Sequence, residues 1–320
     1  MKKTAIVTGV TGQDGSYLSE LLLEKDYKVY GLIRRSSSGD LGCSSHLKNK
    51  VDFSEIDLTD LSSITRICKL ARADEFYNLA AQSHVGTSFN QPVLTSQINA
   101  VGVLNCLEAI RESGYHTRFY QASTSEMYGG IYGEVKMNES SQFHPRSPYG
   151  VSKLYGYWMT VNYRESYKMF TCNGILFNHE SPRRGQNFVT RKITTGIRDI
   201  VGGKIKKIRL GNINSKRDWG HARDYVKGMW MMLNHSKPDD YILATGETHS
   251  IKEFLDIAFK RAGLGSYEDY VEIDPQFYRP AEVDVLIGDA TKAKSQLGWQ
   301  PDYKFIDLVH DMVDSDLKNK

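Results

Sequence analysis

Two side chains four residues apart, Tyr149 and Lys153, form the pattern that points most directly to catalysis. They open an expected helix, where this spacing places both side chains on one face. An ammonium group lowers the pKa of a neighbouring phenol, so Tyr149 could act as a base near neutral pH. The pair therefore predicts removal of a proton from a sugar or alcohol hydroxyl. The alternative is an amphipathic pair on a helix surface.

A polar segment, Ser123-Thr124-Ser125-Glu126, follows an expected strand and supplies a carboxylate. Glu126 could take a proton from a substrate carbon and later return it. Thr124 could hydrogen-bond the same hydroxyl as Tyr149. The alternative for Glu126 is a cap or a surface acid, and for Ser123 and Ser125 a structural and a functional role are both open.

A glycine-rich turn, Gly9-Val-Thr-Gly12-Gln-Asp-Gly15, follows the first expected strand and opens the first helix. Glycines permit a tight turn and close approach of the backbone to a pyrophosphate, and the helix N-terminus offers N–H groups to phosphate oxygens. The spacing is GxxGxxG, and it predicts a dinucleotide site. The alternative is a turn between strand and helix that binds no ligand.

The end of the second expected strand indicates which dinucleotide binds. It reads Arg34-Arg35-Ser36, where an NAD site usually carries an acid for the ribose hydroxyl. Two guanidinium groups and a hydroxyl suit a 2′-phosphate, which favours NADP over NAD. The alternative is a solvated strand end. Asp57, after the third strand, either accepts from the adenine amino group or caps a helix.

Strands and helices alternate through the first half of the chain and must position these groups. The expected strands are 4–8, 28–33, 51–56, 75–79, 118–122 and 171–177, and the expected helices include 61–71, 93–113 and 149–167. This alternation predicts an α/β fold with a Rossmann-type doubly wound parallel sheet. We expect residues 1–177 to form an NADP-binding domain. Residues 178–320 should form a smaller, mixed α/β domain that mainly binds substrate, with the chain returning in part to the first domain.

The net charge of +3 conceals a strongly basic segment. Residues 183–217 carry eleven basic side chains and one acid, a net charge of +10, so the rest of the chain carries −7. The near-neutral total argues against a nucleic-acid or membrane-surface binder. We see no run of about 18 apolar residues and expect no membrane-spanning helix. Scattered cysteines and histidines predict no disulfides and no metal site, and the N-terminus predicts a cytoplasmic protein.

Eight segments together resemble the GDP-mannose 4,6-dehydratases of the extended short-chain dehydrogenase/reductase group. They are TGVTGQDGSYL (8–18), AAQSHV (80–85), QASTSEMYG (121–129), PRSPYGVSKLYGYW (145–158), ILFNHESPRRG (175–185), FVTRKI (188–193), KRDW (216–219) and RPAEVDVL (279–286). The resemblance covers nearly the whole chain. The Thr-Ser-Glu triplet separates it from the dTDP-glucose dehydratases, which carry an Asp-Glu pair, and from the 4-epimerases, which lack the acid.

The resemblance implies a hydro-lyase that converts GDP-D-mannose to GDP-4-keto-6-deoxy-D-mannose by internal hydride transfer through bound NADP, for deoxysugar biosynthesis. It implies that Tyr149 takes the proton of the C4 hydroxyl. It also implies that Glu126 takes the C5 proton and protonates the hydroxyl that leaves C6 as water. Thr124 and Lys153 complete the catalytic set. A GDP-sugar reductase or epimerase is the alternative enzyme, and an NADP-bound scaffold is the alternative outside catalysis.

The resemblance also carries over binding positions. For the cofactor these are Gly9, Thr11, Gly12, Gln13, Asp14, Arg34, Arg35, Ser36, Asp57, Leu58, Leu79, Ala80, Ala81, Ser83, Lys153, His179 and Arg184. For the GDP-sugar they are Asn178, Val189, Lys192, Arg217, Arg279 and Glu282. Leu94 stands where many relatives have a tyrosine, and one residue is inserted near 130–133. In relatives the loop after Arg34–Ser36 reaches a neighbouring subunit, which implies a homo-oligomer, either a dimer or a tetramer.

Overall fold

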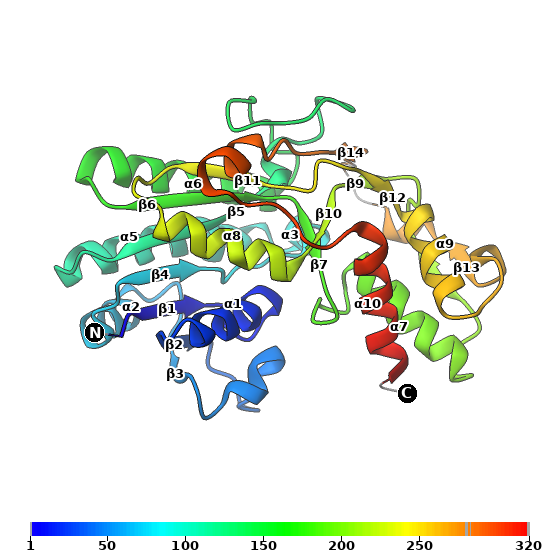
Figure 1. Cartoon of the computed structure of the whole chain (residues 1–320), viewed down its shortest axis with the longest axis horizontal. Helices are drawn as coiled ribbons and strands as arrows, with labels where there is room; N and C mark the ends of the chain where they lie inside the picture. The colour runs from blue at the N-terminus through cyan, green and yellow to red at the C-terminus, as the bar shows by residue number, and fades with distance from the viewer. Residues whose placement is uncertain (1, 279–280, 282, 319–320) are drawn as a thin grey trace.

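The chain is built around a seven-stranded sheet in which every neighbouring pair is parallel (Figure 1). The computed structural model describes residues 2–278, 281 and 283–318. In spatial order the strands are β11 (Asp240–Leu243), β6 (Thr171–Leu176), β5 (Arg118–Thr124), β4 (Glu75–Asn78), β1 (Thr4–Thr8), β2 (Lys28–Ile33) and β3 (Asp52–Glu55). The chain order reverses between β1 and β4, and ligands bind at the carboxyl ends of strands beside such a reversal. The predicted fold class is confirmed.

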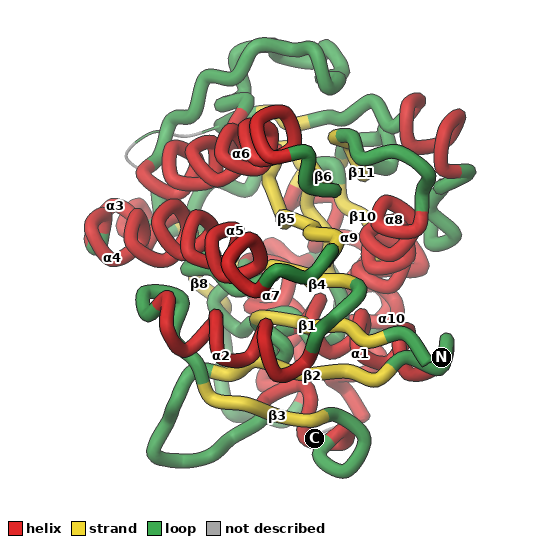
Figure 2. Tube along the Cα trace, turned by 90° about the vertical axis from the view of Figure 1, so that its left-hand side faces the viewer, coloured by secondary structure: helices red, strands yellow, loops and turns green. Residues whose placement is uncertain are grey.

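Alternating side chains of the strands pack helices on both faces of the sheet. On one face, Ile6, Phe76 and Phe119 join a core with α2 (Leu61–Ala71), α5 (Gly102–Ser113) and α6 (Pro148–Tyr167). On the other face, Val7, Tyr77 and Tyr120 pack with α1 (Gln13–Glu24) and α8 (Ala222–Asn234). Figure 2 shows these two helix layers on either side of the strands. Burial on both faces explains why the strands read as continuous apolar runs.

One long helical run has an unusually apolar composition. It joins α4 (Pro92–Ser96), a π-helical stretch (Gln97–Val101) and α5. By length and composition alone, the run Pro92–Ser113 could cross a membrane, a property that the sequence reading did not anticipate. Half of its most apolar window is buried inside the fold, where it packs against α2 and α6. We therefore describe it as a core helix of the α/β layer.

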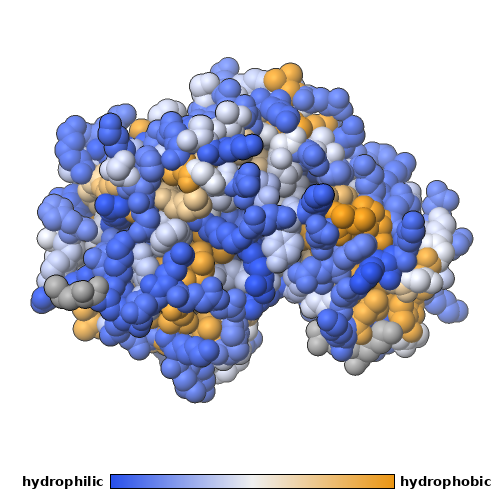
Figure 3. All heavy atoms as spheres, viewed as in Figure 1, coloured by the Kyte–Doolittle hydropathy of each residue, from blue (hydrophilic) through white to orange (hydrophobic). Residues whose placement is uncertain are grey.

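A second lobe follows the main sheet. Its core contains Ile193 of α7 (Val189–Val201), Phe254 of α9 (Ile251–Arg261) and Met312 of α10 (Phe305–Lys318). Its short strands are β7 (Asn178–Glu180) with β10 (Trp219–His221), β12 (His249–Ser250) with β9 (Lys216–Arg217) and β14 (Val285–Leu286), and β13 (Val271–Ile273) with β8 (Ile208–Leu210). Figure 3 shows an indentation between the two lobes on this face.

Single-turn and other short helices fill the connections. They are Gly42–Leu47, α3 (Val85–Asn90), Ser125–Met127, Tyr267–Asp269, Pro275–Phe277 and the π-helical Ala293–Leu297. Three elements beyond residue 178 belong to the first lobe, because α8 packs on α1, β11 pairs with β6, and Ala293–Leu297 packs on α8 and β11. We therefore propose a functional division at 177/178, with 222–243 and 293–299 returned to the cofactor-binding lobe.

Candidate active site

A cavity of about 600 Å³ lies at the carboxyl ends of the strands and is lined by both lobes. The first lobe supplies the ends of β4 and β5 and the start of α6, and the second supplies α7, β9 and the segment 276–278. The predicted site residues that line it are Asp14, Leu79, Ala81, Ser83, Thr124, Glu126, Tyr149, Lys153, Asn178, His179, Arg184, Val189, Lys192 and Arg217. Residues expected to act on cofactor, sugar and diphosphate thus share one enclosure.

Other predicted positions do not line this cavity. Ten of them follow β1, β2, β3 or β4, and so lie along the same edge of the sheet. They are Gly9, Thr11, Gly12, Gln13, Arg34, Arg35, Ser36, Asp57, Leu58 and Ala80. Leu94, which replaces a tyrosine of many relatives, also stands outside the lining and is 42% exposed. Arg279 and Glu282 lie outside the described residues.

The glycine-rich turn packs too tightly for side chains at two positions. Gly9 has a φ of +66°, and a Cβ there would lie 2.8 Å from the Ala80 nitrogen. A Cβ on Gly15 would lie 2.3 Å from the Gly9 carbonyl oxygen. The N-cap of α1 is Gly12, which has no side chain to occupy the first-turn N–H groups. The turn therefore has the shape of an anion cradle at a helix N-terminus.

Tyr149 and Lys153 are both buried in the first turns of α6. The helix is fixed there by Ser147, whose hydroxyl accepts from the Gly150 N–H at 3.0 Å, and by Pro148 in the first turn. The Lys153 Nζ lies 5.9 Å from the centroid of the Tyr149 ring and donates to the Ala122 carbonyl oxygen at 2.8 Å. The predicted placement on one face is thus what the structure has.

The structure does not give this pair the pKa values that the spacing predicts. Burial raises the pKa of the Tyr149 phenol to about 12, although a hydrogen bond with Thr124 lowers it and the Glu126 carboxylate raises it further. Burial also lowers the pKa of the Lys153 ammonium to about 8. Removal of both groups from water outweighs their expected cooperation, because each is disfavoured in its charged form.

Thr124 and Glu126 reach the cavity from the end of β5. Thr124 is the N-cap of the turn Ser125–Met127, since its hydroxyl accepts from the Glu126 N–H at 3.3 Å. Thr124 is therefore the capping residue, and Glu126 lines the cavity. Ser123 donates to the Asn173 side chain at 3.2 Å, a structural contact inside the sheet.

The strand ends at β2 and β3 carry the groups expected at the adenosine end of a dinucleotide. Arg34, Arg35 and Ser36 are exposed. Asp57 accepts from the N–H and the hydroxyl of Thr59, at 2.8 and 2.7 Å. These bonds hold the pKa of the Asp57 carboxyl below its ordinary value. The cap of α2 is Asp60, so the helix-cap interpretation of Asp57 is wrong.

Several lining residues were not expected from the sequence. Phe277 lies under Lys192, whose Nζ is 3.6 Å from the ring centroid, and Ser215 is buried beside Arg217. The Ser215 hydroxyl has no hydrogen-bond partner among the residues that the structure describes. His84 also lines the cavity and was visible only as part of the AAQSHV segment. Lone serines and aromatics give no sequence signal of this kind.

Comparison with known proteins gives a consistent result. A family model described as GDP-mannose 4,6 dehydratase matches residues 6–312. The chain is 49% identical to the GDP-mannose 4,6 dehydratase of Drosophila melanogaster over 99% of this chain and 86% of that protein. It is 52% identical to GDP-mannose 4,6 dehydratase 2 of Arabidopsis thaliana over 99% and 87%. A solved structure of RMD from Pseudomonas aeruginosa complexed with NADPH has a TM-score of 0.82 at 21% identity and covers 100% of both chains.

Proposed function

The chain belongs to the GDP-mannose 4,6-dehydratase family, and from this premise we propose that it converts GDP-D-mannose to GDP-4-keto-6-deoxy-D-mannose and water. The observation that carries the proposal is the single cavity wall formed by Thr124, Glu126, Tyr149 and Lys153. A tyrosine alone serves oxidation and reduction at an alcohol. The added carboxylate of Glu126 supports elimination of water, which a reductase or an epimerase does not need.

The cofactor is proposed to be NADP, and the residues present fit it. The glycines at 9 and 15 let the turn pack closely on the protein's own backbone, and the uncapped start of α1 can receive a pyrophosphate. The exposed Arg34 and Arg35 stand at the end of β2 where an NAD site usually has an acid. Bound NADP⁺ supplies a positively charged hydride acceptor that later returns the hydride.

The side chains have separable tasks. Tyr149 takes the proton of the C4 hydroxyl, and Thr124 hydrogen-bonds that hydroxyl beside it. Glu126 takes the C5 proton, made acidic by the C4 ketone, and protonates the hydroxyl that leaves C6 as water. Tyr149 then gives its proton to C5 as C6 receives the hydride that C4 lost, so the reaction is redox-neutral overall. Burial raises the pKa of Tyr149 to about 12, so proton removal would be favoured by a positive charge beside the phenol, which oxidised NADP would bring.

The test is the product formed from GDP-mannose, measured by mass spectrometry beside UDP- and dTDP-sugars. We expect a product lighter by one water from GDP-mannose and no net consumption of NADP. Stoichiometric oxidation of NADPH without a deoxy product would establish the reductase alternative. Glu126→Gln should stall after oxidation and accumulate reduced cofactor, while Glu165→Gln, at an exposed position on α6, should turn over normally.

We also propose a homo-oligomer in the cytoplasm. Val151, Tyr155 and Trp158 on α6 are between 42% and 56% exposed and recur at helical spacing, and Leu94 and Val101 of the adjacent helical run are similarly exposed. Exposed apolar side chains on two adjacent helical segments favour burial against another subunit. Light scattering should give a dimer or a tetramer, and Trp158→Glu should lower the mass. A wild-type monomer would contradict the proposal.

A further inference from the structure

Both ring nitrogens of His179 face oxygen atoms that accept hydrogen bonds. Nδ1 lies 2.8 Å from the Phe177 carbonyl oxygen, and Nε2 lies 2.8 Å from Oδ2 of Asp14. A carbonyl oxygen can only accept, so Nδ1 must carry a hydrogen. The Nε2 contact then also needs a hydrogen, from an imidazolium ring or from a carboxylic acid. The two side chains are only 11% and 21% exposed, so water does not settle the choice.

The other contacts of Asp14 favour the carboxylate. The amide of Gln13 is oriented by Ser181, whose hydroxyl donates to Oε1 at 2.7 Å. The Gln13 Nε2 therefore donates to Oδ1 of Asp14 at 2.9 Å and to the His179 carbonyl oxygen at 3.1 Å. A carboxylate that receives hydrogen bonds at both oxygens is stabilised in its charged form. Burial opposes both charges, but their mutual attraction prevails, so the pKa of His179 is raised and that of Asp14 is lowered.

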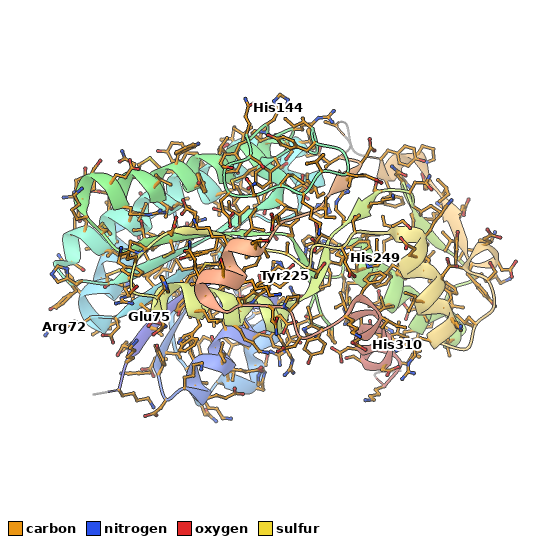
Figure 4. The ribbon with its side chains drawn as sticks, turned by 45° about the horizontal axis from the view of Figure 1, so that its top comes forward. Arg72, Glu75, His144, Tyr225, His249 and His310 are labelled. Carbon is orange, nitrogen blue, oxygen red and sulfur yellow. The ribbon has the colours of Figure 1, made fainter. Side chains whose placement is uncertain are left out.

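The surroundings of the ring also suit a cation. His179 stacks on Tyr225 of α8, with ring centroids 4.6 Å apart and an interplanar angle of 19°. Figure 4 shows Tyr225 near the centre of the molecule, where the lobes meet. Arg184 is the nearest opposing cation, and its Nε is 3.0 Å from a carboxylate oxygen of Glu180. Arg184 therefore has a counter-ion of its own beside the pair.

Three more titratable groups face Asp14 from neighbouring elements. They are Tyr149 and Lys153 on α6 and Tyr120 on β5, and the Asp14 carboxylate raises the pKa of each. Uncharged phenols at Tyr120 and Tyr149 leave Lys153 and His179 as the positive groups that share the Asp14 carboxylate, since Arg184 is paired with Glu180. The charge of Asp14 thus belongs to the catalytic pair as well as to the glycine-rich turn.

A second histidine shows the opposite arrangement and supplies an internal control. Nδ1 of His221 accepts from the Arg223 N–H at 3.1 Å, and Nε2 lies 3.1 Å from Oδ2 of Asp311. One nitrogen accepts and the other donates, so a neutral ring satisfies both contacts. The hydrogen bonds of the two buried histidine rings therefore require different charges, and the aspartate beside His221 is 46% exposed.

We propose that Asp14 is a positioning residue that holds His179 as a buried imidazolium. The two opposite charges cancel, so the phosphates of the bound cofactor do not face an unpaired Asp14 carboxylate. Both side chains were expected to bind cofactor, and this inference gives them a different task. It rests on the proposed function only for the identity of the cofactor. Without its partner, either charge would stand alone beside the glycine-rich turn and change phosphate affinity directly.

The experiment measures NADP dissociation constants, without sugar substrate, for the wild type, Asp14→Asn, His179→Gln and the double variant. Asp14→Asn makes His179 neutral and leaves the local charge unchanged, so affinity should stay within about threefold. His179→Gln leaves the carboxylate alone and should weaken binding about tenfold or more, and the double variant should restore it. Asp311→Asn, at the contact with the His221 ring, should leave the NADP affinity unchanged.

Two outcomes would overturn the proposal. One is additivity, in which the double variant binds as the product of the single effects. The other comes from NMR of protein labelled with ¹⁵N-histidine, where His179→Gln assigns one of the nine histidines. We expect two protonated ring nitrogens near neutral pH in the wild type and one in Asp14→Asn, so a neutral wild-type ring refutes the pair. This readout decides even if GDP-mannose is not converted, which separates it from failure of the proposed function.

Discussion

Replacing Lys153 with methionine should stabilise the ligand-free protein while removing activity. The Lys153 ammonium is buried, and its pKa falls from 10.5 to about 8. At 1.36 kcal/mol for each pH unit, the fold disfavours the charged form by about 3 kcal/mol. Methionine has a similar length and no charge, so it should recover much of this free energy.

The cost of the lost hydrogen bond is small in this setting. Lys153 donates to the Ala122 carbonyl oxygen, but Gln121 Nε2 donates to the same oxygen at 3.0 Å and remains after the substitution. No buried acceptor is left unpaired, which would otherwise cost about 1–3 kcal/mol. We therefore expect Lys153→Met to raise the free energy of unfolding at pH 7 by about 1–3 kcal/mol.

The pH dependence gives the sharper test. Between about 8 and 10.5 the unfolded chain binds a proton at Lys153 that the folded chain does not, so wild-type stability from this group rises with pH. The advantage of Lys153→Met should be complete below pH 8 and should vanish toward pH 10.5. Urea unfolding of cofactor-free protein across this range measures the difference, with Lys153→Arg as the variant that keeps its charge. A difference that does not change with pH would refute the reasoning.

Three further predictions concern the edge of the sheet. Gly15→Ala should abolish NADP binding in a titration followed by fluorescence, because its Cβ would lie 2.3 Å from the Gly9 carbonyl oxygen; retained affinity would mean that the turn can open. Arg35→Ala should reduce the ratio of NADP to NAD affinity by about tenfold or more, since charged hydrogen bonds contribute about 1.5–3 kcal/mol, and an unchanged ratio would remove Arg35 from the 2′-phosphate site. Asp60 caps α2, so Asp60→Ala should lower the free energy of unfolding in urea by about 1 kcal/mol and leave NADP affinity unchanged. Asp57→Ala should weaken NADP binding and leave the free energy of unfolding unchanged. Equal effects of the two substitutions would contradict these separate roles.

The order of strands and helices up to residue 176 could be predicted because it depends on local apolar patterns. Each buried strand is a short apolar run, and the expected ranges 4–8 and 28–33 match β1 and β2 residue for residue. The return of α8 and β11 to the first lobe could not be placed in the same way. It depends on pairing between residues 173–176 and 240–243, and a sequence pattern does not state which edge a distant strand will join.

The sequence predicted where several of these side chains lie better than it predicted their pKa values. Tyr149 and Lys153 lie where the spacing places them, but their pKa values follow from burial, which the tertiary structure decides. Phe277 was missed for a topological reason. It follows β13, which pairs in parallel with β8, so the segments after both strands meet at one end, and a Cβ on Gly211 would lie 2.7 Å from the Phe277 carbonyl oxygen.

Much of the positive charge in the basic segment 183–217 is neutralised by ion pairs in the folded chain. Most of its cations are paired with carboxylates, including Arg183 with Glu20, Arg184 with Glu180, Arg191 with Asp316, Arg198 with Asp199, Arg209 with Glu272 and Lys216 with Glu134. These pairs join the segment to α1, to α10 and to the loop that carries residue 134. Lys192 differs, because its Nζ lies on the Phe277 ring, 3.6 Å from the centroid. A net charge of +10 therefore overstates the attraction for a diphosphate, since paired charges cancel at a distance. The salt dependence of GDP-sugar affinity should reflect the few cations that line the cavity, with Lys192 foremost.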